Sequence, residues 1–218
     1  MIYVTGDTHG LNDFDKLEAF FEERPAKEDD VLLILGDCAV LWSEIANYTK
    51  EYSSLGPTVL FIDGNHENFP MLNALPIIEK YGAKLHKVSP RVFHILRGEI
   101  LEIEGKSFLC MGGATSTDKY LRKEGISWWK EENITDKDLA NAFENLKKHN
   151  YEVDYVLTHC APTSTLMRMF PFDADDNTDQ LDRLKAKTNF KKWYFGHYHQ
   201  DKTRGDYRCF YYDIIELD

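Results

Sequence analysis

The residues of this sequence best suited to chemistry are aspartates, histidines and an asparagine that stand beside glycine or just after apolar runs. They occur in five short motifs, which read GDTHG from Gly6, GDC from Gly36, GNHE from Gly64, THCAP from Thr158 and GHYH from Gly196. Carboxylates and neutral imidazoles are ligands of borderline divalent ions such as Mn, Fe and Zn. They are more numerous than one tetrahedral ion can bind, so the pattern favours a two-metal site with one bridging carboxylate.

Buried strands are the elements that must position these motifs. The runs IYVTGD, DDVLLILGD and PTVLFIDGN predict strands that end in a motif, and NDFDKLEAFFEER and SEIANYTKEYSS between them predict helices. Asn12 or Asp13 is the expected N-cap of the first helix. This β-α-β-α-β order indicates a largely parallel sheet, and ligands bind at the carboxyl ends of such strands. We therefore expect the motifs to meet at one rim.

The rest of the chain changes in style. A helix is expected over Met71–Lys80, followed by short alternating strands in KLHKV, RVFHIL, EILEIEG and KSFLCMGG that predict an antiparallel section. DKDLANAFENLKKHN predicts a helix, and DYVLTHC, WYFGHYHQ and CFYYDIIEL predict further strands. Residues 114–133 resemble a substrate-side insertion, and the acidic stretch 172–180 is expected to be a mobile surface loop.

Each motif alone has an ordinary explanation, since Asp-Gly and Asn-His after a strand are common turn chemistry. The joint occurrence of five motifs at strand ends favours a site. His86, His94 and His149 fall outside the pattern and are interpreted as surface or strand histidines.

Composition limits the class of partner. The 218 residues include 26 basic and 37 acidic side chains, a net charge of -11, which disfavours binding to duplex nucleic acid or an anionic membrane. The opening MIYVTGD has no signal-peptide pattern, and no apolar run approaches the length of a membrane helix. Four scattered cysteines predict reduced thiols in a cytoplasmic protein.

In this order, the five motifs resemble the D-x-H, G-D, G-N-H-E, H and G-H-x-H blocks of the calcineurin-like metallophosphoesterases, in particular the small bacterial and phage type. The resemblance implies a single domain over 1–218 with a four-layer α/β/β/α sandwich and two central mixed sheets. It also implies two divalent ions, with Mn favoured over Fe, Zn, Ni or Co. The first ion would be held by Asp7, His9, Asp37 and His199, and the second by Asp37, Asn65, His159 and His197. Asp37 would bridge the ions, His66 would face the substrate, and Glu67 would be structural.

The sequence departs from the phosphoprotein phosphatases of this superfamily, which extend the second block to G-D-x-x-D-R-G. Val40 and Leu41 stand where the aspartate and arginine would be, which disfavours a specialised protein phosphatase. The insertion offers substitutes, since Lys119 and Arg122 could grip phosphate and Trp128 or Trp129 could stack on a ring. Arg97 is a further candidate for the phosphate contact, and the alternative is that both tryptophans only pack.

Three functions compete. The leading interpretation is hydrolysis of phosphate mono- or diesters by a metal-bound hydroxide, on a small or mobile substrate such as a nucleotide or phosphopeptide, with Asp37 and His66 as catalytic residues. The second is a single-strand nuclease or cyclic phosphodiesterase that stacks bases on the insertion. The third is a non-catalytic protein-binding scaffold, which the complete set of predicted ligands disfavours.

Overall fold

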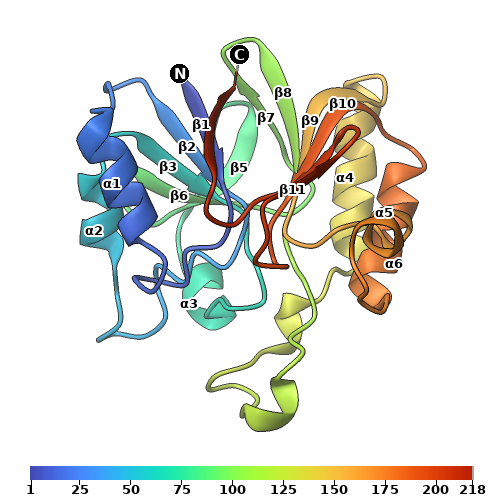
Figure 1. Ribbon diagram of the computed structural model, residues 1–218, viewed down its shortest axis with the longest axis horizontal. Coiled ribbons are helices and arrows are strands. Elements are labelled where there is room, and N and C mark those ends of the chain that lie inside the picture. Colours follow the sequence, from blue (N-terminus) through green and yellow to red (C-terminus); the bar gives the residue numbers. More distant parts are fainter. Residues whose placement is uncertain (218) are drawn as a thin grey trace.

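Two mixed β-sheets lie face to face at the centre of the molecule, and helices cover both outer faces (Figure 1). The computed structural model describes residues 1–217. The first sheet has the order β13 (Ile214–Leu217), β1 (Ile2–Thr5), β2 (Val31–Ile34), β3 (Thr58–Phe61), β6 (Val92–Ile95), β5 (Ala83–Lys87) and β4 (Ile77–Lys80). The second has the order β11 (Lys202–Arg204), β12 (Tyr207–Cys209), β10 (Asn189–Phe195), β9 (Glu152–Thr158), β8 (Lys106–Met111) and β7 (Ile100–Ile103).

The helices divide between the two outer layers. On one side lie α1 (Asp15–Glu23) and α2 (Thr49–Ser54), and on the other α4 (Asp136–Lys148), α5 (Thr163–Met169) and α6 (Asp176–Lys185) (Figure 1). The short α3 (Phe69–Asn73) and the 3-10 turns η1 (Lys119–Leu121) and η2 (Lys130–Glu132) lie near the site edge. This is the α/β/β/α sandwich with two central mixed sheets that the sequence led us to expect. None of the described helices is long and apolar enough to cross a bilayer.

Strand direction follows the sequence pattern. β1, β2, β3 and β6 run parallel, as the uninterrupted apolar runs predict. The predicted antiparallel section forms two hairpins, β5–β6 and β7–β8. These hairpins lie in different sheets, so the chain crosses from one sheet to the other between β6 and β7.

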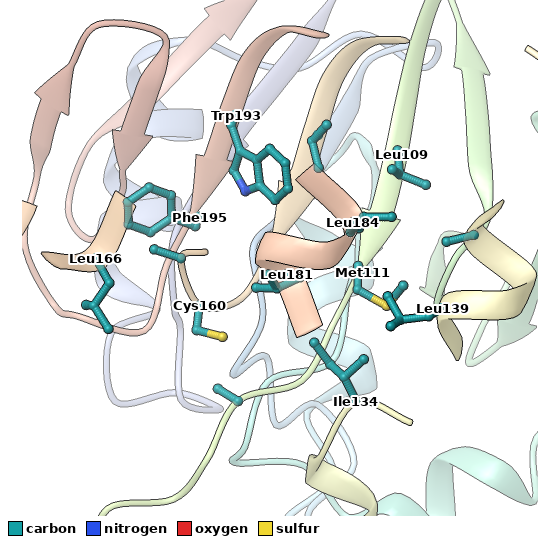
Figure 2. Packing of buried hydrophobic residues seen from close by; sticks show 14 of the residues in the cluster. Leu109, Met111, Ile134, Leu139, Cys160, Leu166, Leu181, Leu184, Trp193 and Phe195 are labelled. Atoms are coloured by element: carbon teal, nitrogen blue, oxygen red, sulfur yellow. The ribbon is translucent and has the colours of Figure 1, made fainter. Parts of the chain in front are cut away.

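The core has three layers, which explains why both faces of most strands are apolar. In β2, Leu33 packs between the two sheets, while Leu32 packs toward α1 and α2. In β8, Phe108 packs between the sheets and Leu109 packs under α4 and α6. Figure 2 shows this last layer, in which Trp193 and its apolar neighbours lie between the second sheet and the helices that cover it.

Two predicted helices are wrong in extent. The helix expected over Met71–Lys80 ends at Asn73, and Ile77–Lys80 forms strand β4, which pairs antiparallel with β5. Pro76 explains the break, because a proline has no N–H to donate and restricts the residue before it. The helix expected from Ser43 begins only at Thr49, since the Ser43 hydroxyl accepts a hydrogen bond from the Ala46 N–H and closes a local turn.

The stretch expected to be a mobile surface loop is also wrong in part. Helix α6 begins at Asp176, and Asp175 and Thr178 form a reciprocal capping box at its start. Asn177 is buried, and its Oδ1 accepts a hydrogen bond from the Ile134 N–H, which fixes this helix start to the end of the insertion. The first helix is not capped as predicted either, since Phe14 precedes it and makes no side-chain cap.

Candidate metal centre

The five motifs lie at the carboxyl ends of strands from both sheets. After β1, β2, β3, β9 and β10 come, respectively, Asp7, Asp37, Asn65 with His66, His159, and His197 with His199. Since β1 to β3 run parallel in one sheet and β9 and β10 run parallel in the other, the motifs reach the same edge of the sandwich. In Figure 1 this edge is opposite the chain termini.

Asp37 lies between the two halves of the cluster. Its Oδ2 is 3.3 Å from His9 Nε2, and its Oδ1 is 3.3 Å from His159 Nε2. His159 Nε2 is also 3.3 Å from Asn65 Oδ1. One buried carboxylate thus faces both groups of candidate ligands, the position that a bridging ligand of a two-metal site needs.

Asp7 holds the other side of the cluster. Its Oδ2 is 3.2 Å from His199 Nε2, and the His199 ring centre is 5.0 Å from that of His9. Three sets of ligand atoms lie within 4.8 Å of one another: Asp7 with His9 and His199, His9 with Asp37 and His66, and Asp7 with Asp37 and His159. The His197 ring is 5.0 Å from that of His159 but belongs to none of these sets.

Two observations fit divalent ions to these residues. Asp7 Oδ2 is buried and accepts no hydrogen bond from the residues described, although His199 is close. The imidazoles of His159 and His9 each have Nδ1 engaged, by the Leu35 carbonyl at 2.7 Å and by Asp13 Oδ2 at 2.7 Å. A proton fixed on Nδ1 leaves Nε2 free to bind a metal, and Nε2 is the atom that faces the cluster.

The electrostatics point the same way. Burial raises the pKa of Asp37, but His159 and His9 outweigh it and hold that pKa well below its usual value. Burial lowers the pKa of His159, and Asp37 and Asp7 raise it to about 10; for His9, Asp37 outweighs burial and gives a pKa of about 9. The buried carboxylates of Asp7 and Asp37 therefore favour positive charge nearby, which protonated histidines or bound cations can provide.

The GHYH motif is a turn and not a continuation of the strand. β10 ends at Phe195, and His197 and His199 both have positive φ, at 68° and 49°. Such strain in non-glycine residues persists where the surrounding structure enforces it, often at functional sites. Tyr198 packs into the core as predicted, stacked on Phe170 with ring centres 4.7 Å apart, and its ring also lies edge-on to that of His197, at 5.0 Å.

Glycines before the motif residues allow the close approach. A Cβ on Gly64 would lie 2.1 Å from Asp37 Oδ1, and one on Gly196 would lie 2.2 Å from Asp7 Oδ1. No side chain fits at either position without displacing a candidate ligand.

Asp13 and Tyr211 support the cluster and were missed from the sequence. Asp13 accepts a hydrogen bond from the Tyr211 hydroxyl at 3.0 Å while it orients His9, and the Tyr211 ring stacks on His199 with centres 4.6 Å apart. The four-residue separation of His9 and Asp13 was a signal, but it was interpreted as helix capping. Tyr211 lies outside the motifs, 12 residues after His199, and no pattern in the sequence singled it out.

The departure in the second block has a structural counterpart. Val40 and Leu41 are buried in the core under α1 and α2 and do not face the cluster. Glu67 is structural as predicted: its carboxylate accepts hydrogen bonds from the N–H groups of Cys38 and Ala39, at 2.8 and 3.0 Å, and so holds the loop after Asp37.

Arg122 is the insertion residue that reaches the cluster. Its Nη2 lies 3.4 Å from His66 Nε2, while its Nε donates to Asp118 Oδ1 at 2.8 Å. The His66 N–H donates to Asp37 Oδ1 at 2.7 Å, which ties this half-buried residue to the centre. Burial and the Arg122 charge lower the pKa of His66 further than Asp37 raises it.

The other insertion candidates lie differently. Trp129 is buried and packs edge-on against Trp42, with ring centres 5.6 Å apart, so packing accounts for it. Trp128 is half-buried, and the Lys119 ammonium lies 5.9 Å from its ring centre. This cation–π contact lies over one face of the ring.

Arg97 does not face the cluster, which contradicts the prediction that it could grip phosphate. Its Nε donates to Asp63 Oδ2 at 2.8 Å, and its Nη1 donates to the Asn133 carbonyl at 2.7 Å. His94 Nε2 lies 3.2 Å from the other Asp63 oxygen, and His86 Nδ1 lies 3.0 Å from His94 Nδ1. His86 and His94 are thus buried strand residues, and Arg97 clamps the end of the insertion to the core.

Comparisons with known proteins agree with this geometry. The fold and the site define a two-sheet sandwich with a cluster of metal-ligand residues at one edge. The family model for calcineurin-like phosphoesterase matches residues 1–201, and the chain belongs to this family. One solved structure superposes with a TM-score of 0.54 over 96% of this chain and 88% of its own, at 11% identity, which supports the fold alone. No curated protein matches the sequence.

Proposed function

We propose that the protein hydrolyses phosphate esters with the help of two divalent ions, with Mn as the first choice. The observation that carries the proposal is the position of Asp37, with one oxygen turned to His9 and the other to His159. Family membership supports the same class of reaction. A non-catalytic scaffold would have no use for buried carboxylates kept without a permanent counter-charge.

We assign the roles of the residues from the family resemblance, and their positions in the cluster support the assignment. Asp7, His9, Asp37 and His199 would hold one ion, and Asp37, Asn65, His159 and His197 the other. Bound there, the ions would activate water and neutralise charge on the phosphoryl group. His66 and Arg122 lie together at the rim of the cluster, where both can contact phosphoryl oxygens. Asp118 holds the guanidinium in place through its Nε.

For the substrate we propose a small or mobile phosphate ester, such as a nucleotide or phosphopeptide. The net charge of -11 disfavours duplex DNA, and the cation–π contact of Lys119 engages one face of the Trp128 ring on which a single strand would stack. The four cysteines are buried and free, which supports the expected cytoplasmic location.

A substrate panel tests the proposal. Mn-loaded protein is assayed with p-nitrophenyl phosphate, bis-p-nitrophenyl phosphate, nucleotides, a phosphopeptide and a short single-stranded oligonucleotide, with Asp37→Ala as the control. We expect turnover of at least one small ester that Asp37→Ala abolishes. Full turnover by Asp37→Ala would contradict the two-metal site, and preferred cleavage of the oligonucleotide with steep salt dependence would favour the nuclease.

Arg122→Ala tests the contact at the rim. Because a guanidinium that grips phosphate contributes to substrate binding, we expect a higher KM, with Lys123→Ala as the matched exposed control. An unchanged KM would return Arg122 to a structural role in the insertion.

A further inference from the structure

The base of the insertion contains a buried pair, Ser116 and Glu132, that touches one predicted metal ligand. Both side chains are almost fully buried, at 1% and 0% exposed. Glu132 accepts two hydrogen bonds from Ser116, from its N–H at 2.9 Å and from its hydroxyl at 2.6 Å. The Asn65 Nδ2 donates to the same hydroxyl oxygen at 3.3 Å. The three residues form one chain of hydrogen bonds that ends at the metal cluster.

The polarity of this chain is fixed by the carboxylate. An ionised carboxylate only accepts hydrogen bonds, so the Ser116 hydroxyl donates its single proton to Glu132. Only lone pairs then remain on the Ser116 oxygen for Asn65. The Asn65 amide must turn its NH₂ toward Ser116, and its Oδ1 then faces His159, whose Nε2 is 3.3 Å away.

This orientation decides whether Asn65 can bind a metal. The two ends of an asparagine amide have nearly the same shape, but only the oxygen has lone pairs to give a cation. A reversed amide would present NH₂ to the ion and oppose two lone pairs at Ser116. Buried hydrogen-bond partners of metal ligands act in this way, and their loss typically lowers metal affinity about 10–100-fold.

We propose that Ser116 and Glu132 are positioning residues that hold the Asn65 amide oxygen toward the second metal ion. The inference rests on the proposed function, because it assumes that Asn65 is a ligand. It also gives the insertion a second task besides the presentation of Arg122, since Ser116 and Glu132 lie at its two ends.

Glu132→Gln is the sharpest test, because it keeps the shape and reverses the polarity. To keep accepting from the Ser116 N–H, the new amide must place its NH₂ against the Ser116 hydroxyl. Either that hydroxyl turns its proton toward Asn65 and the amide reverses, or the proton loses its buried acceptor. A purely structural clasp would survive this change, since the hydrogen bond to the Ser116 N–H remains.

The measurement is Mn binding. Metal analysis gives the number of bound ions, and electron paramagnetic resonance distinguishes a coupled pair of Mn ions from a single ion. We expect wild type to bind two ions and Glu132→Gln to bind the second ion about 10–100-fold more weakly. Ser116→Ala, which removes the hydroxyl and keeps the N–H, should weaken the same ion. Glu131→Gln, at the exposed neighbouring position, should behave as wild type.

Two coupled ions with wild-type affinity in both Glu132→Gln and Ser116→Ala would overturn the inference. If Glu132→Gln fails to fold, Ser116→Ala alone decides. Failure of the proposed function gives a different result: wild type itself would bind fewer than two ions, which removes the second site and the inference with it. If wild type binds two ions and cleaves no ester in the panel, selective loss of the second ion in the variants still supports the positioning role.

Discussion

Asp37 and Asp63 follow neighbouring strands of the same sheet, and both are about 1% exposed, yet their charges are met in opposite ways. Asp63 receives Arg97, whose Nε and Nη2 both donate to its Oδ2. Asp37 faces only His9 and His159 as charged partners within 4 Å in the described part of the chain. The pKa of both carboxyl groups is lowered against the effect of burial.

The difference separates a structural carboxylate from one kept for a ligand. An arginine cannot lose its proton in a protein, so Arg97 neutralises Asp63 permanently. A histidine can lose its proton when a cation binds. His9 and His159 can therefore neutralise Asp37 while they are protonated, and act as metal ligands once they are neutral. Buried carboxylates that face imidazoles without an arginine are therefore the ones expected to bind metal.

The largest expected effect is on catalysis at Asp37. Asp37→Asn should lower kcat by more than about 10³-fold, because a carboxylate that bridges the two proposed ions would serve both and could not be replaced by a neutral amide. Asp63→Asn, assayed at a temperature where it is folded, should keep kcat within about tenfold of wild type. Steady-state kinetics with saturating Mn measure both. Equal losses of kcat in the two variants would contradict a catalytic role for Asp37 that Asp63 does not share.

In the free energy of unfolding, unlike in kcat, Asp63→Asn should lose more than Asp37→Asn. Asp63→Asn removes the main charged partner of buried Arg97, which among the described residues keeps only Asp138 at 3.4 Å, and should lower the free energy of unfolding by up to about 3–5 kcal/mol. Asp37→Asn should cost the metal-free protein less, because the two imidazoles can become neutral. Urea titration in the presence of a chelator measures both. As a control, Arg97→Met added to Asp63→Asn should restore part of the loss; no restoration would mean that the ion pair is not the cause.

Added metal should sharpen the contrast. Each Mn ion present at 100 times its dissociation constant stabilises the folded protein by about 2.7 kcal/mol, or roughly 5–10 °C in Tm for a chain of this size. We expect the full shift in wild type and in Asp63→Asn, which starts from a lower Tm. Asp37→Asn should show less than half of it. A full shift in Asp37→Asn would place the bound ions elsewhere.

Most residues of the candidate metal centre could be predicted from the sequence because they lie within short motifs. Each motif follows a buried strand, so parallel strand direction alone predicts that they meet at one edge. The supporting residues were not predictable in this way. Tyr211 reaches Asp13, and Glu132 reaches Asn65 through Ser116, only after the two sheets have packed together.

The two errors have different physical reasons. Arg97 was judged by its charge, whereas its partner is Asp63, which lies 34 residues earlier in a segment that was interpreted only as a strand end. The helix expected over Met71–Lys80 followed apolar content and ignored Pro76 and the pairing with β5. A distant partner decides the first case. The second case is local, because β4 and β5 form a hairpin that turns at Tyr81 and Gly82.

The smallest expected effect concerns His86, a histidine near a buried aspartate that is already neutralised. Burial and the neighbouring His94 lower the pKa of His86 to about 4, and Asp63 offsets this only in part. Near the unneutralised Asp37, by contrast, the pKa of His159 is raised to about 10. The unfolded chain binds a proton at about 6.5, so between pH 6.5 and 4 it binds more protons at His86 than the folded protein does. The stability contribution is therefore complete above about pH 6.5 and is lost as the pH falls toward 4.

Between pH 6.5 and 4 we expect the free energy of unfolding to fall by on the order of 1–3 kcal/mol through His86. The fall should be smaller in His86→Gln, because glutamine does not titrate. The measurement is urea unfolding of the metal-free protein at several pH values. His197, whose pKa burial and His159 also lower to about 4, adds the same slope to both proteins, so their difference isolates His86. Identical slopes would show that a proton at His86 is tolerated in the folded protein, and hence that Arg97 does not use up the charge of Asp63. A steeper loss of unfolding free energy in wild type would extend the contrast with Asp37 from metal ions to protons. A histidine near a buried aspartate would then gain a proton readily where no arginine pairs with that aspartate, and resist protonation where one does.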